Sequence, residues 1–122
     1  HYELSGLNEC NFGKFEGKNH SDLDGNEYYQ KWIDSMGELP FPDGESMAEF
    51  KKRSVSEFRK IMFWLENENV NTAAFVVHGG TIMSILSELG DEGKSYYDYI
   101  TDNGEGFVCE WEDGKCRNIM RL

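Results

Sequence analysis

The stretch that decides the fold is Thr72-Ala73-Ala74-Phe75-Val76-Val77-His78-Gly79-Gly80-Thr81-Ile82-Met83-Ser84-Ile85-Leu86. Its apolar first part, residues 72–77, has the length of one β-strand buried on both faces. The apolar residues that follow Thr81 recur at helical spacing, and Gly90 is placed to end that helix in a left-handed conformation. The pattern predicts a strand, a tight turn and a helix, with His78 at the carboxyl end of the strand.

This predicted turn has the features of a ligand site. In α/β proteins, ligands bind at the carboxyl edge of the parallel sheet. Because Gly79 and Gly80 have no side chains, backbone N–H groups could approach an anion at the start of the helix, where the helix dipole favours negative charge. The alternative is a structural role, since a lone histidine in an apolar setting is usually a hydrogen-bonded core residue. We favour the functional interpretation of His78 because of the strand–helix junction.

The composition of the 122-residue chain predicts one packed domain over residues 1–122. Hydrophobic residues make up 39% of the chain and aromatic residues 14%, which is typical of a packed globule rather than a disordered chain. The formal net charge of −11 argues against nucleic acid or an anionic membrane as a partner. The sequence shows no signal-peptide pattern and no apolar run of membrane length, so we expect a cytoplasmic protein.

The cysteines and histidines do not predict a metal site or a cofactor. Cys10, Cys109 and Cys116 lack the spacing of metal ligands, and an odd number does not indicate a disulfide framework. Cys109 and Cys116 could face each other across a hairpin, but free thiols in a reducing cytoplasm are the simpler interpretation. A metal hydrolase that used His78 would need a second histidine at ligand spacing, which the sequence does not offer.

The middle of the chain predicts two helices, in keeping with an α/β pattern. Asn26 can cap a helix over residues 27–34, which Gly37 would close. Ser46-Met47-Ala48-Glu49 is a capping box, and the helix that it starts is expected to run to about Glu66. The buried stripe of that second helix is predicted to consist of Met47, Phe50, Val55, Phe58, Met62 and Leu65.

The N-terminal part of the chain shows no regular pattern, whereas the C-terminal part predicts regular elements. Residues 7–18 show neither helical nor alternating periodicity, but their glycines, aromatic residues and glutamates suggest a shaped, ordered loop. The alternative, which periodicity alone favours, is a surface loop with Phe12 and Phe15 pinned to the core. Residues 96–100 are predicted to form a short helix. Residues 107–112 and 115–121 are predicted to pair as a hairpin, because Asp113-Gly114 is a two-residue turn signal.

Several motifs follow one another along the chain: Leu7-Asn8-Glu9, Phe12-Gly13, Glu16-Gly17, Gly44-Glu45-Ser46, Arg53 and Val77-His78-Gly79-Gly80. This series resembles the histidine phosphatase superfamily, the phosphoglycerate-mutase-like proteins, and most of all the small bacterial phosphatases that include α-ribazole phosphatases. The resemblance extends from about Leu4 to the last hairpin. It implies the C-terminal portion of a three-layer α/β sandwich, with a mostly parallel sheet flanked by helices and a C-terminal β-hairpin.

The resemblance also implies roles for individual residues. His78 matches a histidine expected to donate a hydrogen bond to the phosphoryl oxygens and to stabilise charge in the transition state. Glu9 matches a general acid that protonates the leaving oxygen and then acts as base toward water. Three residues are implied to contact phosphate or substrate: Gly79, Asn11 and Phe12. Three more are implied to cap a helix and support the site: Glu45, Ser46 and Arg53.

One part of the family pattern has no counterpart in this sequence. The family's nucleophile is a histidine in an Arg-His-Gly motif, and neither His1 nor His20 lies in such a setting. We therefore expect that the chain is an N-terminally truncated part of a longer protein and is inactive alone, because losing one member of a catalytic set can cost most of the chemical step. We also expect it to form a homo-oligomer through exposed sheet edges or to pair with strands of another polypeptide.

The predicted function is hydrolysis of a small phosphorylated metabolite through a phosphohistidine intermediate in the full-length protein. Phosphoglycerate mutase activity is a close variant, since it shares the phosphohistidine step. The expected ligand is a small phosphorylated substrate or inorganic phosphate. The alternative of another class is a non-catalytic phosphate-binding or regulatory module, which would bind phosphate weakly without turnover and have a partner at the exposed sheet edge.

Overall fold

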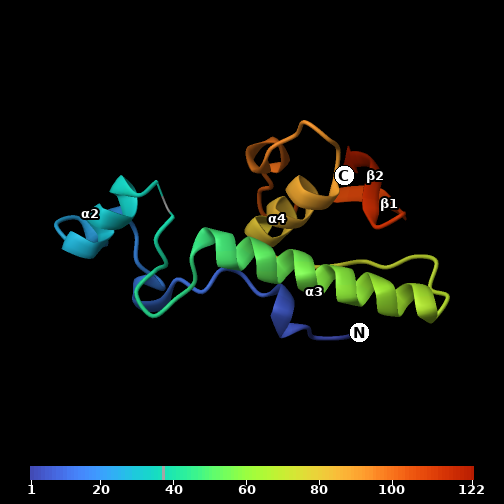
Figure 1. Ribbon diagram of the computed structural model, residues 1–122, viewed down its shortest axis with the longest axis horizontal. Helices are drawn as coiled ribbons and strands as arrows, with labels where there is room; N and C mark the ends of the chain where they lie inside the picture. The colour runs from blue at the N-terminus through green and yellow to red at the C-terminus, as the bar shows by residue number, and fades with distance from the viewer. Residues whose placement is uncertain (37) are drawn as a thin grey trace. The chain divides into compact units, whose positions relative to one another are not determined.

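The computed structural model describes residues 1–36 and 38–122, which form two compact units (Figure 1). Unit 1 consists of His1–Glu9 and Arg53–Leu122, and unit 2 of Cys10–Lys52. Helix α3 (Met47–Asn67) contributes residues to both units. Each unit has its own cluster of buried hydrophobic residues, so each is described by itself.

Unit 2 contains the 3₁₀ helix η2 (Gly13–Phe15) and the helices α1 (His20–Leu23) and α2 (Glu27–Asp34). Helix α2 forms where the sequence predicts it, and the side chain of Asn26 caps it by accepting a hydrogen bond from the Tyr29 N–H at 3.0 Å. The closing role predicted for Gly37 lies outside the described residues. Helix α1 was not predicted, because a single turn gives too short a periodic pattern to recognise.

The core of unit 2 is aromatic. Phe15 is buried, and its ring makes edge contacts with Tyr28, Tyr29 and Phe41 at 6.0–6.2 Å between centroids. Phe12 contacts Phe41 in the same way at 5.1 Å. These contacts agree with the alternative prediction, in which both aromatic rings of the early loop are pinned to the core.

Helix α3 confirms its predicted start, length and buried stripe. The Glu49 N–H donates to the Ser46 hydroxyl at 3.1 Å, and the Glu49 carboxylate accepts from the Ser46 N–H at 3.4 Å, which is the expected capping box. The buried stripe holds Phe50, Val55 and Phe58, while Met47, Met62 and Leu65 are half-buried.

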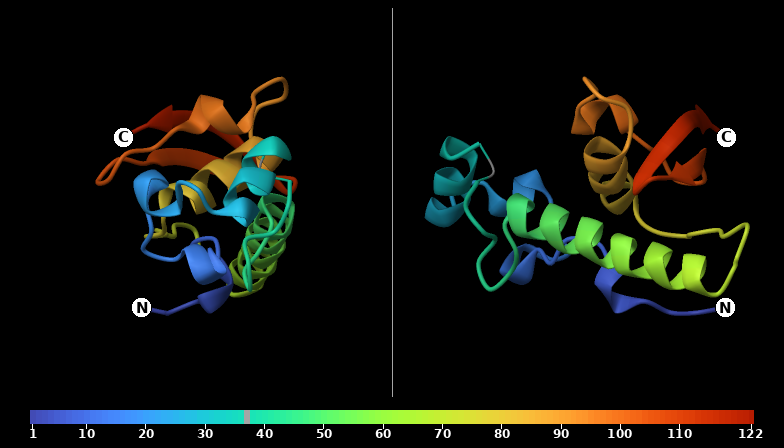
Figure 2. Two further views of the ribbon diagram at one scale, coloured as in Figure 1. Left: turned by 90° about the vertical axis from the view of Figure 1, so that its left-hand side faces the viewer. Right: turned by 45° about the vertical axis from the view of Figure 1, so that its right-hand side comes forward.

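Unit 1 contains η1 (Ser5–Leu7), helix α4 (Gly79–Leu89), η3 (Tyr96–Tyr99) and the antiparallel strands β1 (Phe107–Glu112) and β2 (Lys115–Arg121). Figure 2 shows α4 packed beside this hairpin. The hairpin turn uses Asp113 and Gly114 with φ of 51° and 73°, the two positive values of a type I′ turn, as predicted. Residues 96–100 form a short helix as expected, although it is of the 3₁₀ type.

The core of unit 1 joins α4 to its neighbours. Ile85, Leu86 and Leu89 of α4 are buried together with Val55 and Phe58 of α3, and Tyr99 and Cys116 complete the cluster. Among the described residues, no helix is both long enough and apolar enough to cross a membrane.

The predicted buried strand over residues 72–77 is wrong for this structure. The stretch is extended and runs back along α3 (Figure 1), where the rings of Phe75 and Phe58 lie 5.1 Å apart. Val76 is 100% exposed, whereas Phe75 and Val77 are half-buried. Residues 71–77 form no backbone hydrogen bond with any other described residue. A strand needs a neighbouring strand for its N–H and C=O groups, and the described part of the chain places none beside this stretch.

The predicted parallel sheet is likewise not formed by the described residues, whose sheet is the two-stranded antiparallel hairpin. The coarser prediction of an α/β protein with a C-terminal hairpin is confirmed.

Gly90 also differs from its prediction. It follows α4 directly, but its φ of −92° is not left-handed. A Cβ at this position would lie 2.3 Å from the Leu86 carbonyl oxygen and 2.8 Å from Cδ1 of Ile119. Close packing between the end of α4 and the hairpin, rather than backbone conformation, therefore explains the glycine.

Candidate active site

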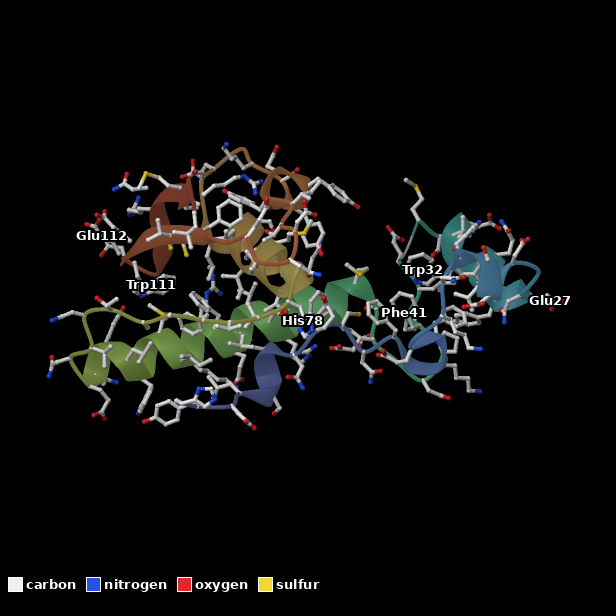
Figure 3. The ribbon with its side chains drawn as sticks, turned by 180° about the vertical axis from the view of Figure 1, so that it is seen from behind. Glu27, Trp32, Phe41, His78, Trp111 and Glu112 are labelled. Carbon is white, nitrogen blue, oxygen red and sulfur yellow. The ribbon has the colours of Figure 1, made fainter. Side chains whose placement is uncertain are left out.

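His78 lies directly before α4 (Figure 3), and the residue is exposed. Its backbone is extended, its side chain does not cap the helix, and its carbonyl oxygen accepts the Ile82 N–H at 3.1 Å. The exposure contradicts the interpretation of His78 as a core histidine. The helix begins at Gly79 rather than Thr81, so the first N–H groups of α4, which have no partner within a helix, start immediately after this residue.

Gly79 is closely packed against another loop of unit 1. A Cβ at Gly79 would lie 3.0 Å from the carbonyl oxygen of Thr101. That distance is tighter than an ordinary van der Waals contact, so a side chain here would push the loop away from the start of α4. The glycine therefore permits a close approach of backbone at the first turn of the helix.

The segment that contains Glu9 is held by Arg53 of α3. The guanidinium donates to the carbonyl oxygens of Gly6 at 2.8 Å, Asn8 at 3.2 Å and Glu9 at 3.3 Å. A planar fork of donors is suited to binding several carbonyl groups at once. Arg53 therefore holds the backbone of this segment, and its implied role in supporting a catalytic site stays a prediction.

A second contact ties the same segment to α4. The buried hydroxyl of Thr81 donates to the carbonyl oxygen of the buried Leu7 at 3.2 Å. The segment leading to Glu9 is thus bonded to the first turn of the helix that follows His78. Sequence reasoning missed Thr81, although its spacing of four residues from Ile85 and again from Leu89 places it on the buried face of α4.

In unit 2, the carboxylates of Glu45 and Glu16 accept hydrogen bonds from the backbone of the loop after Cys10. Asn11 and Glu45 form a reciprocal pair: the Asn11 N–H donates to the Glu45 carboxylate at 2.9 Å, and the Glu45 N–H donates to the Asn11 carbonyl at 2.8 Å. The Phe12 N–H donates to Oε1 of Glu16 at 2.9 Å, and the Gly13 N–H donates to Oδ1 of Asn11 at 2.9 Å. Three successive N–H groups are therefore bonded within the protein, and phosphate contacts by Asn11 and Phe12 stay predictions.

Phe12 also lines an aromatic pocket of about 350 Å³ in unit 2. Its walls include Phe15, Tyr29, Trp32 and Phe41, and the rings of Trp32 and Phe41 stack with centroids 4.9 Å apart (Figure 3). Residues 16–20 add charged and polar groups to the lining, so the pocket combines ring surfaces with hydrogen-bonding groups.

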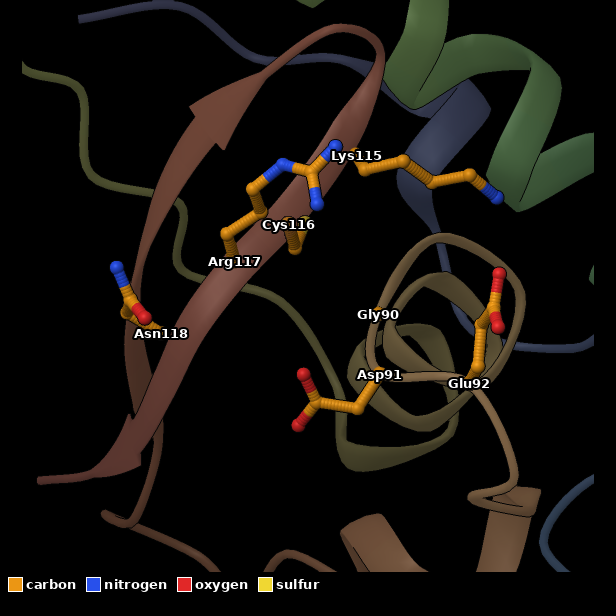
Figure 4. A pocket seen from close by; sticks show the side chains of 7 residues that line it. All are labelled: Gly90, Asp91, Glu92, Lys115, Cys116, Arg117 and Asn118. Carbon is orange, nitrogen blue, oxygen red and sulfur yellow. The ribbon is translucent and has the colours of Figure 1, made fainter.

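A separate pocket of about 380 Å³ lies in unit 1 between the end of α4 and the hairpin (Figure 4). Asp91 and Glu92 line it on the side of α4, and Lys115, Cys116 and Arg117 line it on the side of β2. None of the residues predicted for catalysis lines this pocket. The described residues include no cluster of three or more His, Cys, Asp or Glu side chains that could hold a metal ion.

Comparison with known proteins identifies the family. Residues 2–120 match the model of the histidine phosphatase superfamily (branch 1), so the chain belongs to that superfamily and the resemblance drawn from the motifs is confirmed.

Among curated proteins, the chain is similar to the 2,3-bisphosphoglycerate-dependent phosphoglycerate mutase of Chlamydia pneumoniae, with 31% identity over 93% of this chain and 51% of that protein. The enzyme of the same name from Chlamydia muridarum is 28% identical over the same shares. A protein of Hydrogenobacter thermophilus described as a candidate phosphoserine phosphatase is 32% identical over 66% of this chain and 38% of that protein. The chain spans about half the length of the two mutases. No solved structure matches it significantly.

Proposed function

We propose that this chain is part of an enzyme that transfers the phosphoryl group of a small phosphorylated metabolite through a phosphohistidine intermediate. The observation that supports this proposal most directly is the pair of contacts made by Thr81 and Arg53. They hold the segment of Glu9 against α4 and α3, and α4 begins directly after His78. Glu9 and His78 each match a catalytic position of the family, and these hydrogen bonds connect the segments that contain them.

In the proposed reaction, the imidazole of the exposed residue His78 donates a hydrogen bond to the phosphoryl oxygens. The N–H of Gly79 and the N-terminal end of the α4 dipole add to the stabilisation of negative charge. The Glu9 carboxyl group protonates the oxygen that leaves phosphorus. The resulting carboxylate then takes a proton from the water that attacks the phosphohistidine, which returns Glu9 to its starting state.

The nucleophile in this proposal is a histidine outside the 122 residues, because neither His1 nor His20 lies in an Arg-His-Gly setting. In the full-length protein, residues 72–77 would then become a strand of the three-layer sandwich. The chain alone would bind phosphate without sustained turnover.

The test is made on the protein translated with whatever coding sequence precedes His1. Assayed on a panel of phosphomonoesters, its His78→Ala and Glu9→Gln variants should each lose about 10²-fold or more in kcat, which is typical of removing a transition-state donor or a proton-transfer group. His1→Gln, a histidine change at an exposed position outside the proposed site, is the matched control and should leave kcat unchanged.

Hydrolysis and mutase activity differ only in the group that accepts the phosphoryl: water, or a hydroxyl of the substrate. Three of the curated relatives are named phosphoglycerate mutases, which makes mutase activity the second candidate. Release of inorganic phosphate favours hydrolysis, and interconversion of phosphoglycerates favours the mutase. Turnover by a chain verified to contain only these 122 residues would overturn the proposal that the nucleophile lies outside them. Phosphate binding by the longer protein without either reaction would favour the non-catalytic module.

A further inference from the structure

Cys109 of β1 and Cys116 of β2 are neighbours across the hairpin. Cys116 pairs with Trp111, and Cys109 lies two residues before Trp111, which makes the two cysteines diagonal neighbours on one face. The register shifts beside Cys109, between Val108 and Glu110. The two side chains are hydrogen-bonded to each other, and both thiols are free.

The two thiols have different surroundings. Cys109 is exposed, whereas Cys116 is 3% exposed and belongs to the core cluster with Leu89 and Tyr99. The Cys116 thiol donates a hydrogen bond to Cys109 and lowers the pKa of Cys109 to about 7. The same bond, together with burial, raises the pKa of Cys116, while Lys115 opposes this rise. Cys109 is therefore the thiolate of the pair near neutral pH, and Cys116 keeps the proton.

An accessible thiolate next to a second, protected thiol is the arrangement in which a first cysteine is oxidised and a second resolves it. Neither residue has a part in the phosphoryl transfer proposed above. The wall of the pocket between α4 and the hairpin includes Cys116 (Figure 4), so chemistry at this pair changes the surface of that pocket.

We propose that Cys109 and Cys116 are a redox modification site, at which a peroxide converts the thiol pair to an intrachain disulfide. In the first step the Cys109 thiolate attacks one oxygen of hydrogen peroxide, an S–O bond forms, the O–O bond breaks, and hydroxide leaves. In the second step the Cys116 sulfur attacks the sulfenic acid, an S–S bond forms, and the S–O bond breaks. Hydroxide leaves again. The protons of the two thiols convert both hydroxides to water, and the two electrons lost by the sulfur pair reduce one peroxide.

The disulfide joins the strands next to the register shift and ties an exposed strand residue to a core residue. Its cross-link spans only a short loop, so we expect a modest gain in stability. Reduction by an excess of a small dithiol reverses the reaction.

The experiment treats the purified, reduced chain with hydrogen peroxide and counts free thiols before and after. Two of the three thiols should be lost, the intact mass should fall by two hydrogen atoms, and peptide mapping should find Cys109 joined to Cys116 in a monomer. The Cys10→Ala variant should behave like the parent chain. Cys109→Ser, a change at an exposed position, should abolish the cross-link and leave Cys116 reduced.

A further variant separates the two steps. In Cys116→Ala, Cys109 should stop at the sulfenic acid, which dimedone captures. Because Cys116 is buried, folding of this variant is checked by circular dichroism. If the variant does not fold, the thiol count and the peptide map of the parent chain decide whether the proposal holds. Retention of all three thiols, a disulfide that includes Cys10, or disulfide-linked dimers would each overturn the proposal.

Discussion

The hydroxyl of Thr81 donates a hydrogen bond to the carbonyl oxygen of Leu7, 3.2 Å away, and both residues are buried. Leu7 lies two residues before Glu9, and Thr81 lies three residues after His78. This single bond therefore links the stretch that contains the proposed general acid, Glu9, to the stretch that contains His78, the proposed hydrogen-bond donor to the phosphoryl oxygens. Because a buried carbonyl that loses its partner costs more than the bond itself contributes, the link is also a stability determinant of unit 1.

We predict that Thr81→Val, which keeps the shape and removes the hydroxyl, lowers the free energy of unfolding by about 1–3 kcal/mol. The measurement is urea unfolding followed by circular dichroism. Ser84→Ala is the matched control on the same helix: Ser84 is equally buried, but its hydroxyl bonds only to the Gly80 carbonyl within α4 at 2.8 Å. An equal loss in both variants would show that the Thr81–Leu7 bond has no special weight.

Arg53 gives a second prediction for the same segment. Arg53→Lys should lower the free energy of unfolding by about 1–3 kcal/mol, because one ammonium group cannot reproduce the fork that binds the carbonyls of Gly6, Asn8 and Glu9. Proteolytic cleavage near Glu9 should also become faster. Arg59→Lys, an exposed change on the same helix, should stay within about 0.5 kcal/mol of the parent chain. Unchanged stability and protease resistance in Arg53→Lys would contradict a supporting role.

Elements that depend on local signals could be predicted from the sequence. Helix α3 follows from the Ser46–Glu49 capping box and its apolar stripe, and the hairpin follows from alternation around the Asp113-Gly114 turn. Both depend on hydrogen bonds between residues close together in the chain. The stretch 72–77 has an equally strong strand pattern, but a strand forms only with a partner, and its sequence does not say which partner is present.

In the candidate site, too, local features could be predicted from the sequence and contacts between distant residues could not. The position of His78 before a helix could be predicted, since glycines and helical spacing are local features. The bonds from Thr81 to Leu7 and from Arg53 to Glu9 join residues that are 74 and 44 positions apart, and no local pattern predicts them. Arg53 was identified as a site residue only because it matches a motif of the family.

Substitution of Gly13 tests how closely the early loop of unit 2 packs against the backbone at Pro42. Its φ is 56°, and a Cβ there would lie 1.9 Å from the Pro42 carbonyl oxygen. We predict that Gly13→Ala lowers the free energy of unfolding by about 2 kcal/mol or more beyond the loss in Gly17→Ala. Gly17 is the matched control, because its φ is 69° but a Cβ would meet nothing within 4 Å, so only the cost of the left-handed backbone remains. Equal losses in urea unfolding would contradict the close packing of Gly13 on Pro42.

The hydrogen bond between the two hairpin cysteines predicts how the reactivity of Cys109 depends on pH. Thiolate is the form that reacts with iodoacetamide, so a pKa of about 7 places the midpoint of the alkylation rate near neutrality, with rates rising as pH increases through it. Removing the donor in Cys116→Ala should shift this midpoint upward, toward about 8.5.

At pH 7 the variant then has a smaller thiolate fraction, but each thiolate is more nucleophilic, so the rate should fall by only about threefold. Peptide mass spectrometry of Cys109 against pH measures both quantities, with Cys10→Ala as a control that keeps the midpoint of the parent chain. A midpoint that stays near 7 in Cys116→Ala would show that another group activates Cys109, because the sulfur–sulfur hydrogen bond is the largest cause of the lowered pKa in this hairpin.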